Sequence, residues 1–277
     1  LRAVRIAAKL DFAIEPMTRA AIEAHAADVV WVSEERIGSE VRRMLAAPTP
    51  SRAVELMSAT GILATTLPEL DQLPTDATRR ALATLDLVAR DHPGQERLAL
   101  AALLGELTPE LAHSVLLRLR VASRDADVVS ALVAAAPGRY DRAWADADVR
   151  RFMGRVPADM VAELLQLRAA RAEAMAGDDP DAPVREAELA KRVSRQEAAA
   201  SPLTLAALAV DGRDLRETLG LPEGPVIGTI LERLLADVIE DPSLNTRLTL
   251  LTRASLILEE LMQQRDAAAG PAGPPIR

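Results

Sequence analysis

Apolar residues recur at intervals of three and four positions along almost the whole sequence, for example in residues 37–45 and 227–238. One-sided apolar stripes with this period are typical of amphipathic α-helices. We predict helices at residues 2–10, 16–25, 34–46, 50–59, 76–90, 95–106, 109–119, 123–136, 147–154, 157–176, 184–199, 213–219, 224–239 and 243–266.

Only residues 29–32 resemble a β-strand, and four residues without alternation or a partner run cannot form a sheet. Aromatic residues make up 2% of the chain, so Leu, Ala, Val and Ile must fill the core, and most of the abundant residues are tolerated well in helices. The sequence therefore predicts an all-α fold, an elongated multi-helical array with no sheet.

Local signals predict several helix starts and breaks. Thr49, Thr108 and Asp241 each precede a proline, so each can cap a helix whose first residue is that proline. Residues 177–183 combine Gly, Pro and Asp, which predicts a linker. Residues 267–277 contain much Gly and Pro and little apolar surface, which predicts a disordered C-terminus.

Composition excludes several kinds of site. The chain has no cysteine and three histidines, so thiolate chemistry is impossible and a histidine-based metal site is not expected. The net charge of −8 argues against a protein that coats nucleic acid along its whole surface, although local basic patches remain possible. No apolar run is long enough for a membrane span and no signal-peptide pattern opens the chain, so we expect a cytoplasmic protein without membrane contacts.

Arg2 and Arg5 lie three positions apart in a basic opening segment that has no acidic residue before Asp11. On a helix they would share a face, where two guanidinium groups could bind a triphosphate or the edge of a base. A solvated basic face is the alternative explanation. The sequence begins with Leu inside a predicted helix, so we expect it to be part of a longer protein.

The opening "LRAVRIAAKLDFAIEPMTRAAI" resembles the segment that follows the acidic nucleotide-selecting motif of class II tRNA nucleotidyltransferases (CCA-adding enzymes) and bacterial poly(A) polymerases. The resemblance implies that Arg2 and Arg5 belong to the nucleotide site. The Asp and first Arg of that motif, and the catalytic head with its two aspartates and Mg²⁺, would precede Leu1, so no catalytic residue is expected in this chain. Ile6 departs from the usual Phe of the pattern.

The segment "VSEERIGSEVRRMLAAPTPSRAVELMSATGILATTLPEL" is similar to the neck helices of the same family. Arg36 and Glu40 are four positions apart, a spacing that favours an ion pair on a helix. We interpret them as neck residues that support the nucleotide site, by structure rather than by direct chemistry.

The middle of the chain resembles, less closely, an HD-type metal-dependent phosphohydrolase domain. Gly105 and Glu106 occupy the positions of the His and Asp that hold the metal in that family. A single Glu without imidazole partners is not a metal site. We therefore expect an HD-like scaffold that binds no metal, and no cofactor bound by this chain.

A third segment, "PLTLAALAVDGRDLRETLGLPEGPVIGTILERLLADVIEDPSLNTRLTLLTRA", resembles the tail module of the family. Gly220 can end one helix and Pro225 can begin the next. The backbone N–H groups of Gly224, Val226, Ile227 and Gly228 would then bind RNA phosphates, with little steric hindrance from residue 228. Tight helix–helix packing at Gly228 is the alternative.

The resemblance implies the following organisation: neck, 1–66; degenerate HD-like body, 67–176; linker, 177–183; tRNA-binding tail, 184–266; disordered C-terminus, 267–277. The implied parent enzyme adds C, C and A to tRNA 3′ ends from CTP and ATP. A poly(A) polymerase, an enzyme that adds only CC or only A, and a non-catalytic helical RNA-binding or protein-interaction scaffold remain alternatives. DNA is not an expected partner.

Overall fold

The computed structural model describes residues 1–222 and 224–269, and all regular structure in these residues is helical. The predicted all-α class is therefore confirmed. The α-helices are α1 Arg2–Leu10, α2 Pro16–Ala24, α3 Glu34–Leu45, α4 Ser51–Ala59, α5 Ile62–Thr66, α6 Pro68–Asp71, α7 Thr75–Asp91, α8 Glu96–Leu104, α9 Pro109–Arg118, α10 Ser123–Ala135, α11 Asp146–Met153, α12 Val161–Ala174, α13 Ala182–Ala198, α14 Gly212–Leu219, α15 Pro225–Glu240 and α16 Arg247–Ala269. Four 3₁₀ segments join them: η1 Ala26–Trp31, η2 Ala158–Met160, η3 Leu205–Ala207 and η4 Pro242–Leu244.

The chain forms two compact units, and each is discontinuous in sequence. Unit 1 comprises Leu1–Arg142 and Val156–Ala190, and unit 2 comprises Ala143–Arg155 and Lys191–Arg277. The boundary falls inside α13 and on both sides of α11. Within the predicted linker 177–183, residues 177–181 lie in a short turn between α12 and α13 inside unit 1, where Asp179 N–H donates to Met175 O at 2.8 Å, and residues 182–183 begin α13.

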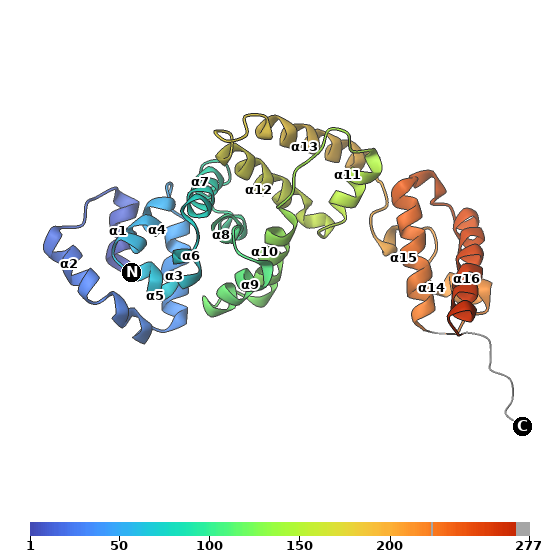
Figure 1. The fold of residues 1–277 in the computed structure, drawn as a ribbon, viewed down its shortest axis with the longest axis horizontal. Helices are drawn as coiled ribbons and strands as arrows, with labels where there is room; N and C mark the ends of the chain where they lie inside the picture. The colour runs from blue at the N-terminus through green and yellow to red at the C-terminus, as the bar shows by residue number, and fades with distance from the viewer. Residues whose placement is uncertain (223, 270–277) are drawn as a thin grey trace, which may run out of the picture. The chain divides into compact units, whose positions relative to one another are not determined.

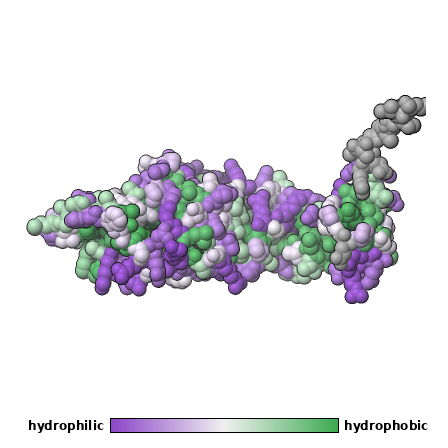
Figure 2. Space-filling view, turned by 90° about the horizontal axis from the view of Figure 1, so that it is seen from below, coloured by the Kyte–Doolittle hydropathy of each residue, from purple (hydrophilic) through white to green (hydrophobic). Residues whose placement is uncertain are grey.

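Unit 1 is built around α8, whose residues 98–104 are all buried. The helices α7, α10 and α12 pack around it, while α1 packs on α3 and α4 (Figure 1). A helix that is apolar on all sides must lie inside a protein of this kind. On the face drawn in Figure 2, polar residues are spread widely, with small apolar areas between them.

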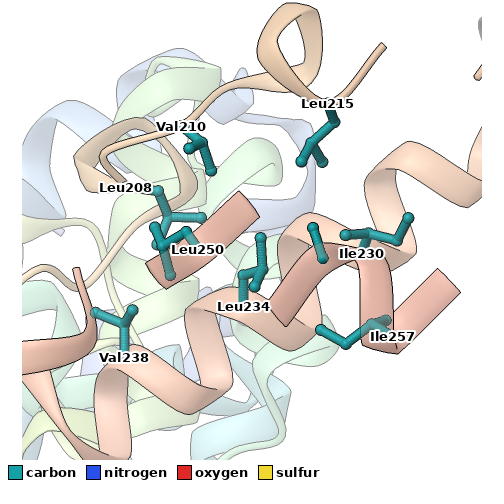
Figure 3. Close-up of a cluster of buried hydrophobic side chains, with 9 residues drawn as sticks. Leu208, Val210, Leu215, Ile230, Leu234, Val238, Leu250 and Ile257 are labelled. Atoms are coloured by element: carbon teal, nitrogen blue, oxygen red, sulfur yellow. The ribbon is translucent and has the colours of Figure 1, made fainter. Parts of the chain in front are cut away.

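Unit 2 has its own core between α14, α15 and α16, which lie side by side in Figure 1. In Figure 3, Leu215 from α14, Ile230 and Leu234 from α15 and Leu250 from α16 converge on this core. Ile230, Leu234 and Val238 are separated by four positions each, so the stripe predicted in residues 227–238 is the buried face of α15.

Arg150 fixes α11 to the end of α15. The residue is 6% exposed, and its guanidinium donates to Ile239 O at 2.6 Å, to Glu240 O at 2.9 Å and to Gln196 Oε1 at 3.0 Å. The last carbonyls of a helix have no partner inside the helix and attract a cation, so Arg150 caps α15 from another part of the chain.

Residues 29–32, which look strand-like but were not expected to make a sheet, belong mostly to η1. Two other local predictions are corrected by the structure. Thr49 does not cap α4, because the helix begins at Ser51, whose N–H and Oγ donate to Asp86 of α7 at 3.0 and 2.6 Å. Residues 267–269 end α16, and the rest of the predicted disordered segment, 270–277, lies outside the described residues.

Candidate functional site

Arg5 is held in place by Glu40 from α3. Its Nε donates to Glu40 Oε2 at 2.7 Å, and both side chains are 17% exposed. The two Nη groups of Arg5 have no partner among the described residues, so they remain available for a bidentate contact with an anion. Arg2, one helical turn earlier, is exposed and likewise makes no ion pair within the part of the chain that the structure describes.

Glu40 therefore has a different partner from the one predicted. It contacts Arg5 and, at 3.3 Å, Arg43 Nη1, whereas Arg36 is exposed and makes no ion pair with any described residue. The predicted pair between Arg36 and Glu40 is wrong because α1 brings the guanidinium of Arg5 to the carboxylate from 35 positions away in sequence. Glu40 is thus the residue that fixes the orientation of Arg5.

Gly38 sets the position of α3, and sequence reasoning did not identify it. A Cβ on this residue would lie 1.9 Å from Leu119 O at the end of α9, a separation that no side chain can adopt. The same carbonyl accepts a hydrogen bond from Arg42 Nη1 at 3.1 Å. Glycine therefore allows α3, which carries Glu40, to lie directly against the end of α9.

At the positions of Gly105 and Glu106, two arginines surround the carboxylate of Glu106. Arg80 Nη2 donates to Glu106 Oε2 at 2.7 Å, and Arg171 Nη2 lies 3.0 Å from Oε1. A Cβ on Gly105 would lie 2.9 Å from Arg171 Nη1, so glycine here leaves room for that guanidinium. The hydrogen bond that Arg80 donates to the carboxylate of Glu106 raises the pKa of Arg80 above its ordinary value. Arg80 and Arg171 come from distant helices, and no local spacing indicated them.

The tail turn has the predicted helix ends. Gly220 ends α14 in the left-handed conformation with φ 64°, and Pro225 is the first residue of α15. A Cβ on Gly228 would meet no atom within 4 Å, so the alternative of tight packing at this glycine is wrong.

The same turn offers fewer free donors than the sequence predicted. Ile227 N–H donates to Gly224 O at 3.2 Å, and the side chain of Ile227 packs against the core of unit 2. Pro225 has no N–H and the N–H of Ile227 is already used. Among the first three residues of α15, only the backbone N–H of Val226 is therefore free to bind a phosphate. The side chain of Val226 is 42% exposed.

The described part of the chain contains no group of three or more His, Asp or Glu residues arranged to hold a metal ion. Within the same residues, no helix is both long enough and apolar enough to cross a membrane.

Comparison with known proteins places the chain in a family. Residues 92–254, more than half of the sequence, match the family described as "tRNA nucleotidyltransferase domain 2". The chain belongs to the tRNA nucleotidyltransferase family. Residues 11–73 match a second family, described as "Probable RNA and SrmB-binding site of polymerase A".

Curated relatives agree with this family. The chain is 27% identical over 286 residues to the A-adding tRNA nucleotidyltransferase of Deinococcus radiodurans, a match that covers 84% of this chain and 62% of the relative. It is 38% identical over 91 residues to the CC-adding tRNA nucleotidyltransferase of Geobacter sulfurreducens, covering 33% of this chain and 21% of that enzyme. Over 109 residues it is 35% identical to the multifunctional CCA protein of Paracidovorax citrulli, covering 33% of this chain and 25% of that protein.

The fold is also that of a tRNA nucleotidyltransferase. The structure is similar to the CCA-adding enzyme of Bacillus stearothermophilus, solved in complex with CTP, with a TM-score of 0.70 and 22% identity. The similarity covers 96% of this chain and 62% of that enzyme. The resemblance to the C-terminal part of this family, stated from the sequence, is confirmed.

Proposed function

We propose that this chain completes the nucleotide site and binds tRNA in a tRNA nucleotidyltransferase that adds CCA to tRNA 3′ ends from CTP and ATP. The catalytic aspartates and Mg²⁺ would belong to a part of the protein outside this sequence. Here the chain's own contribution is to orient a guanidinium toward the nucleotide and to hold the RNA backbone.

The arrangement of Arg5 and Glu40 is the observation that carries this proposal. A guanidinium fixed through Nε by a carboxylate presents its two Nη groups in one orientation. A side chain that is already ordered loses less conformational entropy when it binds a ligand than a mobile one. Arg5 lies in the segment that resembles the one following the family's nucleotide-selecting motif, and family membership supplies the reaction class.

The nucleotide role can be tested in the full-length protein with tRNA that lacks its CCA end. We expect Arg5→Ala to lower kcat/KM for CTP or ATP by about 10- to 100-fold, since a hydrogen bond to a charged group contributes about 1.5–3 kcal/mol. Glu40→Gln should give a smaller loss in the same direction, because it loosens Arg5 without removing it. Arg36→Ala is the matched control, because this arginine is exposed and forms no ion pair within residues 1–222 and 224–269.

Unchanged kinetics in Arg5→Ala would leave Arg5 with a purely structural role. Supplying CTP alone, ATP alone or both would show which nucleotides are added. This assay separates CCA addition from the A-only and CC-only activities named for the relatives, and long A tails would indicate a poly(A) polymerase.

The tail role can be tested at Gly228. The space around this residue is open, so Gly228→Ala should preserve the fold and raise the helix stability by up to about 1 kcal/mol. If an RNA phosphate approaches Val226 N–H, Gly228→Leu should weaken tRNA binding in a stable protein. If the variant binds tRNA with wild-type affinity at two salt concentrations, no phosphate contacts Val226 N–H and the proposed contact is wrong.

A domain of mixed α/β structure with an Asp-x-Asp pair should be encoded upstream of Leu1. The motivation is that the chain spans 62% of the length of the A-adding relative and of the CCA-adding enzyme of similar fold. A start codon directly before Leu1, with no such domain, would favour the non-catalytic scaffold instead.

A further inference from the structure

A cavity of about 310 Å³ in unit 1 is lined by four arginines. It lies between α12, α13 and the loop that follows α10, and its lining includes none of the residues assigned above to nucleotide or RNA. The guanidinium-bearing residues are Arg139, Arg168, Arg171 and Arg185, and the acidic lining residues are Asp179 and Glu186.

Ion pairs within the protein already engage both acids. Arg168 Nε and Nη2 donate to the two carboxylate oxygens of Glu186 at 2.8 and 2.7 Å. Arg185 forms a two-point pair with Asp179, with Nη1 3.1 Å from Oδ1. These two arginines are 4% and 7% exposed, so their guanidiniums are fixed parts of the cavity wall.

The remaining cations are not balanced. Arg171 shares Glu106 with Arg80, so that cluster has two cations for one carboxylate. Arg139 is exposed and makes no hydrogen bond or ion pair with any described residue. The lining has four arginines and two acids, an excess of two positive charges. Including Arg80 and Glu106 adds one charge of each sign and leaves this excess unchanged. Asp181, which acts on Arg185 from outside the lining, offsets only part of this excess.

We propose that this cavity binds a small phosphate-bearing anion, with inorganic phosphate or diphosphate as the simplest examples. A guanidinium presents paired N–H donors that match the oxygens of phosphate, and positive charges gathered around a partly enclosed space favour an anion. The volume is at the lower end of the range for small-molecule sites, which suits a phosphate or diphosphate group. The site is independent of the proposed nucleotidyltransferase function.

Binding can be measured by titration calorimetry and by thermal shift on the 277-residue chain, with phosphate and then diphosphate. We expect saturable binding that raises Tm with ligand concentration. Arg139→Gln should weaken the affinity roughly tenfold, because it removes one charge-assisted contact. Arg139 makes no hydrogen bond or ion pair with residues 1–222 or 224–269 and acts on Asp179 only through its charge, so this variant should fold normally, which circular dichroism would confirm.

Two control comparisons distinguish binding in the cavity from nonspecific attraction of anions to the protein. Arg124→Gln removes an exposed arginine of α10 that forms no ion pair with the residues the structure describes and does not line the cavity, so it should leave binding unchanged. Met175 lines the cavity and is half-buried, so Met175→Glu should abolish binding by adding a negative charge, while Met175→Gln, of the same shape, should retain it.

Several results would overturn the proposal. They are the absence of saturable binding at millimolar diphosphate, equal losses in Arg124→Gln and Arg139→Gln, and equal binding by the two Met175 variants. A loss of tRNA affinity in Arg139→Gln with unchanged diphosphate binding would also overturn it, because the arginine would then face RNA.

Discussion

Gly38→Ala should destabilise unit 1 and disturb the nucleotide site together. The added methyl group would lie 1.9 Å from Leu119 O and 2.8 Å from Leu119 C, which are backbone atoms and cannot rotate away. To reach an ordinary contact, α3 or the end of α9 must move by about 1 Å or more, and such overpacking costs about 1–3 kcal/mol. The movement also stretches the 3.1 Å hydrogen bond from Arg42 to Leu119 O.

The net loss follows from three contributions. A hydrogen bond from a charged donor contributes about 1.5–3 kcal/mol, and Ala gains up to about 1 kcal/mol over Gly inside a helix. We therefore expect the free energy of unfolding to fall by about 2–5 kcal/mol, with Tm falling by about 2–4 °C for each kcal/mol.

The assay is denaturant and thermal unfolding of the wild type, Gly38→Ala and Gly177→Ala. Gly177 is the matched control, because it also lies in unit 1 and a Cβ there would meet nothing within 4 Å. In the full-length enzyme, the displaced α3 should move Glu40 and so raise KM for the nucleotide. A change in stability within 0.5 kcal/mol of the control, about the spread of harmless surface substitutions, would refute the packing argument.

Three further predictions concern other contacts. Arg150→Met should lower the stability of unit 2 by about 2–4 kcal/mol, because two carbonyls at the end of α15 lose their buried donor; an unchanged denaturation midpoint would contradict this. Arg118 lowers the pKa of Glu69 below its usual value of 4.5, so this pair should stabilise the fold above that pH and be lost as pH falls through the lowered pKa. Melting curves from pH 7 to pH 3 should therefore show a smaller acid-induced fall in Tm for Glu69→Gln than for the wild type. An equal fall in Tm in both proteins would show that the pair does not contribute to the acid sensitivity of the fold. Chelator treatment should leave Tm of unit 1 unchanged, because guanidiniums engage Glu106; a fall in Tm that zinc or magnesium reverses would show that a metal binds.

The helices could be predicted well where local chemistry decides them. Thr108 caps α9 by accepting the N–H of Leu111, and Gly220 and Pro225 end and begin helices at the predicted residues. These signals depend on one side chain and its near neighbours. The short helices α5 and α6 were missed, because five and four residues are too few to show a helical period.

The site was harder to predict because its contacts join distant segments. Arg5 was identified from its motif, but its partner Glu40 lies 35 positions away and was assigned to Arg36 by helical spacing. In the same way, Arg171 reaches Gly105 O from 66 positions away. Sequence spacing describes neighbours on one helix and contains no information about which helix packs beside it. The packing alternative at Gly228 could be excluded only from the space around the residue.

The discontinuity of unit 2 has a consequence for synthesis on the ribosome. Arg150 leaves the ribosome 89 positions before Ile239, the first of its two carbonyl partners in α15. At about 5–20 residues per second, α11 must wait roughly 5–18 s before the helix that it caps has been made. During this interval Arg150 lacks both carbonyl partners of α15, so slow translation of residues 197–240 should favour misfolding or chaperone capture of the nascent chain.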